Sequence, residues 1–158
     1  MNVSLLENEI EEVLWLMIYK EYSFHPNINE NEVPFSFKKR YSVYKLTKVW
    51  TSDEEAFINS LLMKLNQEFY VLDWHHDAFR YIPSISFEAF YDFKDKDNNI
   101  RSFPSFYPDG DYHIFISKDL KNIMFSDPWR NSVYIVGRKL MKLFNKNQEI
   151  LSLEKCNF

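Results

Sequence analysis

The chain has 158 residues and a formal net charge of −4, which fits one domain and gives no general reason to expect nucleic-acid binding. Its single cysteine, Cys156, excludes an internal disulfide. The longest apolar run, residues 13–18, is too short for a membrane span of about 20 residues. We therefore expect a cytoplasmic protein that does not enter a membrane.

Two amphipathic helices are predicted in the first half of the chain. Apolar side chains recur at helical spacing over residues 5–22 and again over residues 53–67. Ser52 and Glu55 stand three positions apart at the start of the second segment, which is the spacing of a capping box. Each of these helices is expected to bury one face.

Aromatic and β-branched residues predict strands between and after these helices. The predicted strands cover residues 35–43, 68–74, 79–82, 85–93 and 132–136. A third helix is predicted over residues 138–146, and residues 147–158 are expected to form a partly flexible C-terminal extension. The predicted fold is a single α+β domain over residues 1–146. It has a mainly antiparallel sheet of about five to seven strands, with two or three helices packed on one face.

Residues 103–117 contain the strongest turn signal in the chain. In Tyr107-Pro-Asp-Gly110, proline stands where a preset φ is needed and glycine stands where φ can be positive. Aromatic and β-branched residues flank this turn on both sides. We therefore expect a β-hairpin whose tip carries the carboxylates of Asp109 and Asp111.

Most candidate binding residues fall into two polar clusters, one at the end of the strand 68–74 and one around this turn. The members are Asp73, Trp74, His76, Asp109, Asp111 and His113. If the strands that carry them are neighbours, one histidine can approach a carboxylate, and such a pair can move protons or hold a metal. In an extended chain His75 and His76 point to opposite faces, so at most one of them is expected to serve a given site.

Trp129 is the remaining candidate for binding, and it follows a proline in a predicted bend. Aromatic residues make up 18% of the chain. Rings of this size form a heavy core, but where they are exposed they also supply contact surface at low entropic cost. Trp129 can therefore be part of the core or an exposed anchor for a partner.

No catalytic signature is present in the sequence. It contains no HExxH zinc motif, no Walker loop, no nucleophile elbow and no cysteine–histidine arrangement. We therefore name no catalytic residue, no metal ligand and no cofactor from the sequence.

Several blocks of the chain are similar to the signature blocks of a bacterial family. They are Tyr70-Val-Leu-Asp-Trp-His-His76, Tyr107-Pro-Asp-Gly-Asp-Tyr-His-Ile-Phe-Ile116, and Asp127-Pro-Trp129 followed by Val133-Tyr-Ile-Val-Gly137. Together with Trp15 and Phe24-His-Pro26, they resemble domain-of-unknown-function family 2716, small proteins of bacilli and actinomycetes. The chain departs from that pattern at His75, where the family tends to have glutamine, and at Ser126-Asp127, where it often has glycine and histidine. The resemblance implies a shared fold and no established activity.

Two functions remain open from the sequence. The first is a small protein-binding module, specifically an immunity-type inhibitor that neutralises a partner toxin by binding. The acidic loops suit a basic partner, because charge complementarity speeds association. The alternative is a small-molecule or metal-dependent hydrolase or binding protein that uses His76 with Asp109 or Asp111. Nucleic-acid binding through the basic segment Lys38–Lys48 is the least favoured function.

Overall fold

The computed structural model describes residues 1–29 and 31–156, and these contain three helices and ten strands. The helices are α1 (Asn8–Glu21), α2 (Ser52–Met63) and α3 (Arg138–Lys146). The strands are β1 (Val3–Leu5), β2 (Tyr41–Leu46), β3 (Phe69–Asp73), β4 (Ala78–Tyr81), β5 (Asp92–Lys94), β6 (Ile100–Ser102), β7 (His113–Ser117), β8 (Ile123–Asp127), β9 (Ser132–Val136) and β10 (Leu153–Lys155). None of the helices in this part of the chain has the length and apolar character needed to cross a bilayer.

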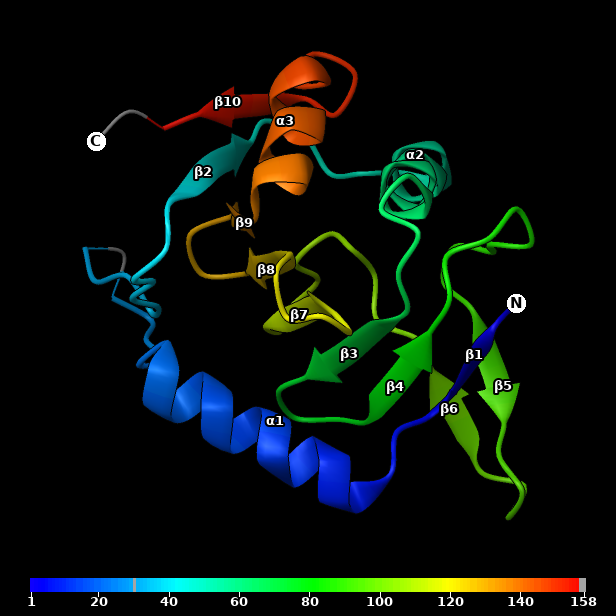
Figure 1. Ribbon diagram of the computed structural model, residues 1–158. Coiled ribbons are helices and arrows are strands. Elements are labelled where there is room, and N and C mark those ends of the chain that lie inside the picture. Colours follow the sequence, from blue (N-terminus) through cyan, green and yellow to red (C-terminus); the bar gives the residue numbers. More distant parts are fainter. Residues whose placement is uncertain (30, 157–158) are drawn as a thin grey trace.

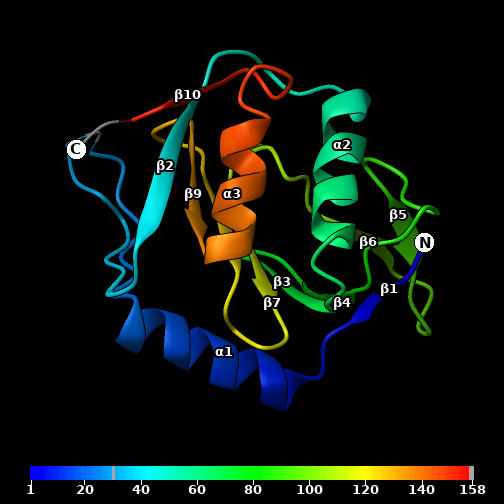
Figure 2. The same cartoon turned by 45° about the horizontal axis from the view of Figure 1, so that its top comes forward.

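Eight strands form one antiparallel sheet in the order β1-β4-β3-β7-β8-β9-β2-β10, and β5 and β6 form a separate hairpin. The expected single α+β domain with a mainly antiparallel sheet is confirmed. The main sheet is larger than the five to seven strands expected, because β1 and β10 add to its two edges. Figures 1 and 2 show these two strands at opposite edges of the molecule.

Helices cover both faces of the sheet. Figure 1 shows α2 and α3 on one face and α1 on the other. Ile58 of α2 and Phe144 of α3 belong to one buried cluster, whereas Leu14 and Ile18 of α1 belong to a second. The prediction of two or three helices packed on one face is met by α2 and α3, and α1 in addition covers the opposite face. The central strands β7, β8 and β9 are buried at every position, so each of their two faces needs a cover.

The hairpin predicted over residues 103–117 does not form. Only residues 113–117 are a strand, β7, and it pairs with β3 and β8. The backbone N–H groups of Phe106 and Tyr107 instead donate to the Glu55 carboxylate of α2 at 2.7 and 3.2 Å. Phe106 is itself fully buried, so this segment docks against α2 and has no strand partner. Gly110 does adopt the expected positive φ, at 79°.

The strand predicted over residues 35–43 begins later than expected, at Tyr41. The preceding aromatic side chains enter the core beneath α1: the Phe35 ring lies 3.9 Å from that of Phe125, and the Phe37 ring 5.3 Å from that of Tyr22. Packing of these rings therefore overrides the alternating pattern. In the predicted strand 85–93, only the last two residues are in a strand, β5.

Part of the expected C-terminal extension belongs to the sheet. β10 pairs with β2, and Leu151, just before it, is fully buried. The Leu151 carbonyl accepts a hydrogen bond from Nε1 of the buried Trp50 at 2.7 Å. Residues 151–155 therefore complete the core beside α3.

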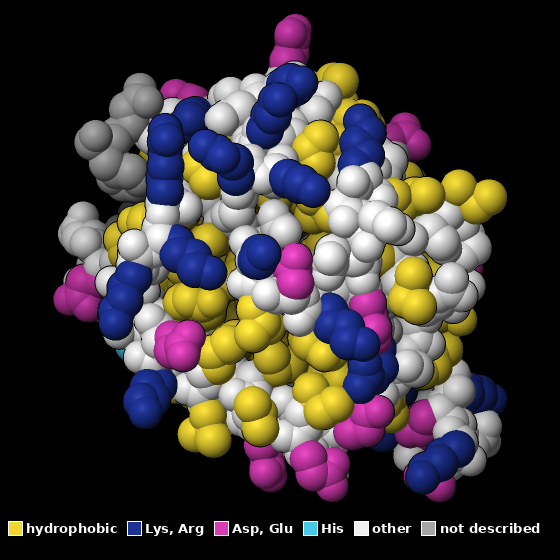
Figure 3. All heavy atoms as spheres, in the orientation of Figure 1, with side chains coloured by type: hydrophobic (Ala, Val, Ile, Leu, Met, Phe, Trp, Pro, Cys, Tyr) yellow, Lys and Arg dark blue, Asp and Glu magenta, His cyan; other side chains and the backbone are white. Residues whose placement is uncertain are grey.

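Charged side chains are unevenly distributed over the surface. Figure 3 shows Lys and Arg side chains gathered over α3 and the neighbouring β2. Arg40, Arg138, Lys142 and Lys146 line one shallow depression there. The basic segment noted in the sequence thus continues onto α3.

Candidate functional site

The candidate residues lie at one end of the main sheet. β3 and β8 end there, and β7 and β9 begin there, because neighbouring strands are antiparallel. In this register, Asp73 stands opposite His113 on the adjacent strand. Asp109 and Asp111 lead into β7, and Trp129 lies in the turn after β8. Strand pairing thus brings together residues that are far apart in the sequence.

The segment after β3 turns instead of continuing as a strand. The His76 backbone N–H donates to the Asp73 carbonyl at 3.1 Å and closes a tight turn. Both histidines of this turn consequently reach Asp111: Nδ1 of His75 lies 3.0 Å from Asp111 Oδ2, and Nδ1 of His76 lies 3.6 Å from it. The extended backbone assumed for residues 75 and 76 is therefore wrong, whereas the expectation that at most one of the two histidines serves the site stays a prediction.

Asp73 and His76 form the central contact, with 2.9 Å between Asp73 Oδ1 and His76 Nδ1. Burial raises the pKa of Asp73, and the hydrogen bond to Asp73 raises the pKa of His76. One ligand-type atom from each of Asp73, His76 and Asp111 lies within 4.8 Å of the others. We call these three residues together with His113 the His–Asp cluster.

His113 is the buried member of the cluster, with a side chain that is 5% exposed. Its Nδ1 lies 2.7 Å from the Ser105 carbonyl oxygen. A carbonyl only accepts hydrogen bonds, so Nδ1 carries the proton. Nε2 points the other way and lies 3.7 Å from Asp73 Oδ2, which is longer than a hydrogen bond.

A cavity of about 460 Å³ opens beside the His–Asp cluster. Its polar wall is mainly acidic and contains Asp73, His76, Asp77, Asp92, Asp109 and His113. Phe90, Ile100 and Phe103 supply apolar walls. Asp109 therefore faces the same space as His76, but of Asp109 and Asp111 it is Asp111 that approaches the His76 ring.

The two candidate tryptophans have different surroundings. Trp74 packs against the His75 ring, with 3.9 Å between centroids, and its Nε1 donates to the Tyr19 hydroxyl at 3.1 Å. Trp129 is 51% exposed. Trp74 thus links α1 to His75, which contacts Asp111 of the cluster, whereas Trp129 presents its indole to solvent.

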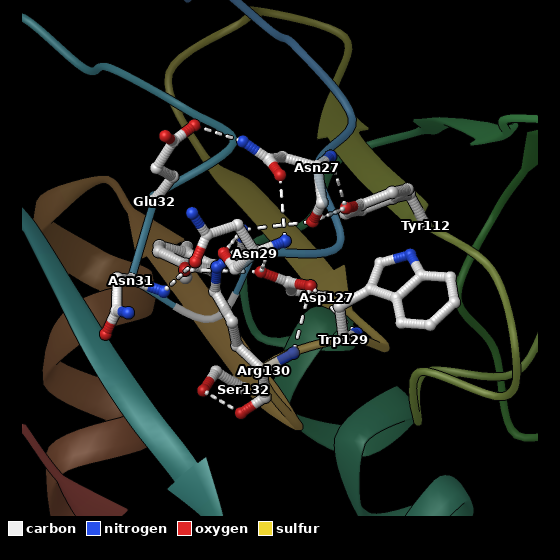
Figure 4. A network of polar contacts seen from close by, with 10 residues as sticks. Asn27, Asn29, Asn31, Glu32, Tyr112, Asp127, Trp129, Arg130 and Ser132 are labelled. Atoms are coloured by element: carbon white, nitrogen blue, oxygen red, sulfur yellow. Dashed lines mark hydrogen bonds and ion pairs between the residues drawn. The ribbon is translucent and has the colours of Figure 1, made fainter.

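A buried ion pair holds the turn that carries Trp129. Asp127 is fully buried and accepts hydrogen bonds from the backbone N–H of Trp129 at 3.1 Å and from Arg130 Nη1 at 2.9 Å. Arg130 Nη2 donates to the carbonyls of Asn27 and Asn29 at 3.0 and 2.7 Å. Figure 4 shows this network, with the Trp129 indole to one side of it. The loop after α1 and the β8–β9 turn are therefore tied together.

Sequence reasoning missed three features of this region. They are the contact of His75 with Asp111, the role of the Ser105 carbonyl, and the Asp127–Arg130 pair. The spacing of three positions between Asp127 and Arg130, across a proline, is a signal that could have revealed the pair. The Ser105 contact uses a backbone atom, which no side-chain pattern reports.

Comparison with known proteins places the chain in a family. The family model described as "Protein of unknown function (DUF2716)" matches residues 5–141, which include every residue of the His–Asp cluster. The chain belongs to this family. The resemblance of its sequence blocks to DUF2716 is thus confirmed.

The chain is also similar to a curated protein whose function is equally open. It is 27% identical over 91 residues to the "Uncharacterized protein YxiI" of Bacillus subtilis (strain 168). The match covers 57% of this chain and 51% of the relative, so the chain spans about half the length of the protein it matches. No solved structure matches the chain.

Proposed function

We propose that this protein is a binding module that holds a partner protein at the end of the sheet where the His–Asp cluster lies. One observation carries the proposal: the antiparallel register brings the cluster, its acidic cavity and the exposed Trp129 to the same end of a rigid sheet. Exposed tryptophans are enriched among residues that dominate binding energy. A binding surface built on strand ends also needs little ordering when the partner arrives.

The chemistry of the cavity favours a basic partner. Asp77, Asp92 and Asp109 line it together with Asp73, and the whole chain has a net charge of −4. A lysine or arginine of the partner that enters the cavity would meet several carboxylates with apolar walls behind them. An immunity-type inhibitor, which neutralises a basic toxin by covering it, has this chemistry.

Co-expression with a candidate toxin tests this function. A candidate basic toxic domain is expressed in a sensitive host with and without this protein, and the affinity of the purified pair is measured by calorimetry. We expect growth to be restored, and Trp129→Ala or Asp109→Asn to weaken binding about tenfold or more. Ile85→Ala is the matched control, because Ile85 is 95% exposed and lies outside the cavity. Absence of both protection and binding contradicts the proposal.

A second function is favoured by the size of the cavity. About 460 Å³ falls within the range of small-molecule sites, and His76 with Asp111 stands beside it. A hydrolase that uses this pair would turn over chromogenic ester or phosphate substrates and lose that activity in His76→Gln. Equal rates for the two proteins would exclude His76 from the reaction.

A further inference from the structure

Partner binding does not explain the position of the His113 ring in the His–Asp cluster. Because Nδ1 of His113 donates to Ser105, the lone pair of a neutral His113 is on Nε2 and faces Asp73 Oδ2. Two electron-rich atoms then face each other at 3.7 Å in a nearly buried position. No hydrogen bond to Nε2 is present among the described residues. Such an arrangement is stabilised by a cation placed between the two atoms.

The rest of the cluster supplies further ligand atoms for such a cation. Asp73, His76 and Asp111 each offer one atom within 4.8 Å of the others. The separations that bear on ligation are 2.9 Å for Asp73–His76, 3.6 Å for His76–Asp111 and 3.7 Å for Asp73–His113. A tetrahedral ion with ligands at about 2.0–2.1 Å places neighbouring ligand atoms about 3.3 Å apart. The separations among Asp73, His76 and Asp111 are compatible with this value, whereas His113 lies outside their 4.8 Å set and is close to Asp73 alone, so ligation by all four residues requires side-chain rotation toward a common centre.

The orientation of His113 is also typical of a metal ligand. Histidines that bind metals usually donate their other ring N–H to a carbonyl or carboxylate, which fixes the tautomer and the ring plane. Ser105 has this role for His113. Imidazole nitrogens with carboxylate oxygens suit first-row divalent ions such as Zn²⁺, and they suit Ca²⁺ or Mg²⁺ less well.

We propose that Asp73, His76, Asp111 and His113 form a binding site for a divalent transition-metal ion of the Zn²⁺ class. His113 is the buried ligand held by Ser105, and His76, which is 67% exposed, closes the site from the solvent side. The proton that now lies between Asp73 and His76 leaves when the ion binds. The site does not require the proposed partner protein, so the two proposals can fail independently.

The test uses the full-length protein, stripped of metal with EDTA and titrated with Co²⁺ as a spectroscopic probe and with Zn²⁺ by calorimetry. We expect one ion per chain, with a visible Co²⁺ spectrum that Zn²⁺ abolishes by displacement. His76→Gln should weaken Zn²⁺ binding at least about tenfold. His25→Gln is the matched control, because His25 is also exposed but its Nδ1 faces the Ser23 backbone carbonyl and no carboxylate of the cluster.

A variant of the buried ligand separates the site from adventitious binding to exposed histidines. His113→Gln, if circular dichroism shows it folded, should lose the Co²⁺ spectrum of the wild type. Should it fail to fold, His76→Gln carries the test, because that side chain is largely outside the core. Wild-type protein that binds no Co²⁺ or Zn²⁺ stoichiometrically, or that binds them no more tightly than His76→Gln, overturns the proposal.

Discussion

Glu54 and Glu55 are neighbours in the sequence and have opposite environments. Glu54 pairs with the half-exposed Lys48, and this contact lowers the pKa of Glu54 to about 2. Glu55 points into the core, where burial raises its pKa to about 8, although the N–H groups of Phe106 and Tyr107 donate to it and oppose the shift. A single step along α2 thus decides whether a carboxyl group is paired with a cation at the start of the helix or enclosed in the core without one.

Glu55 should make the protein less stable as the pH rises. Its pKa in the folded protein is above the unfolded value, so its contribution to stability is complete below about pH 4.5 and is lost as the pH passes through about 8. Between those values the free energy of unfolding should fall by up to about 1.4 kcal/mol per pH unit. Urea unfolding from pH 5 to 8 measures this fall, and Glu55→Gln should remove it.

Glu12→Gln serves as the control for that experiment, because Glu12 lies exposed on α1. The wild type and the control should show the same fall in stability, and only Glu55→Gln should be flatter. Parallel pH profiles for all three proteins would show that Glu55 is not buried as a neutral acid.

At the scale of the element, α2 shows why a correct helix prediction can have the wrong start. The sequence Thr51-Ser-Asp-Glu-Glu55 contains two overlapping pairs with capping-box spacing, Ser52 with Glu55 and Thr51 with Glu54. In the structure Thr51 and Glu54 form the box, and the Thr51 backbone N–H donates to Glu54 Oε2 at 2.8 Å. Glu55 is instead bound to the segment before β7. Tertiary contacts therefore choose between two locally equivalent starts.

Substitution of the two hydroxyl residues should distinguish these starts. Thr51→Ala removes the capping residue and should cost about 1 kcal/mol of unfolding free energy. Ser52→Ala changes the first residue of α2 and should cost less than about 0.5 kcal/mol. Chemical denaturation of both variants checks the difference. A larger loss in Ser52→Ala would mean that the helix starts one residue later than described.

The other elements show which sequence patterns were sufficient to predict the bounds of a helix or strand. α3 and β9 have the predicted bounds, Arg138–Lys146 and Ser132–Val136, because periodicity and β-propensity agree with their packing. The turn Tyr107–Gly110 has the expected glycine conformation and no hairpin, because the Glu55 carboxylate binds the backbone amides that a strand partner would have used. Glu55 belongs to α2 and lies about 50 residues earlier in the sequence, so local patterns around the turn do not reveal this contact.

At the scale of the whole molecule, the candidate site was predictable as far as strand pairing determines it. The meeting of Asp73 and His113 follows once the strands that carry them are neighbours, as the sequence analysis supposed. The contacts of His75 and His76 with Asp111 depend on the turn after β3, and no turn residue such as glycine or proline in Asp73–Asp77 signals that turn. The acidic cavity also needs β5 and β6, whose Asp92 and Ile100 form walls that no motif connects with the histidines.

The C-terminal strand should be needed for stability. Deletion of residues 148–158 removes the buried Leu151 and Leu153, leaves β2 with a free edge and removes the acceptor of Trp50 Nε1. The loss should be at least about 3 kcal/mol, because burial of each leucine contributes about 1.5–3 kcal/mol. Glu154→Ala, at an exposed position of β10, is the control and should leave the urea midpoint unchanged. Equal midpoints for the truncated and full-length chains would contradict this role.

The position of β2 between β9 and β10 also has a consequence for how the chain is made. The ribosome synthesises β2 early, but both of its neighbours are the last two strands to emerge. Until then the nascent chain carries a strand with two unpaired edges, and such edges can associate with other chains. Yield of the native protein during translation should therefore depend on protection of Tyr41–Leu46, and chaperones that bind extended segments would act there first.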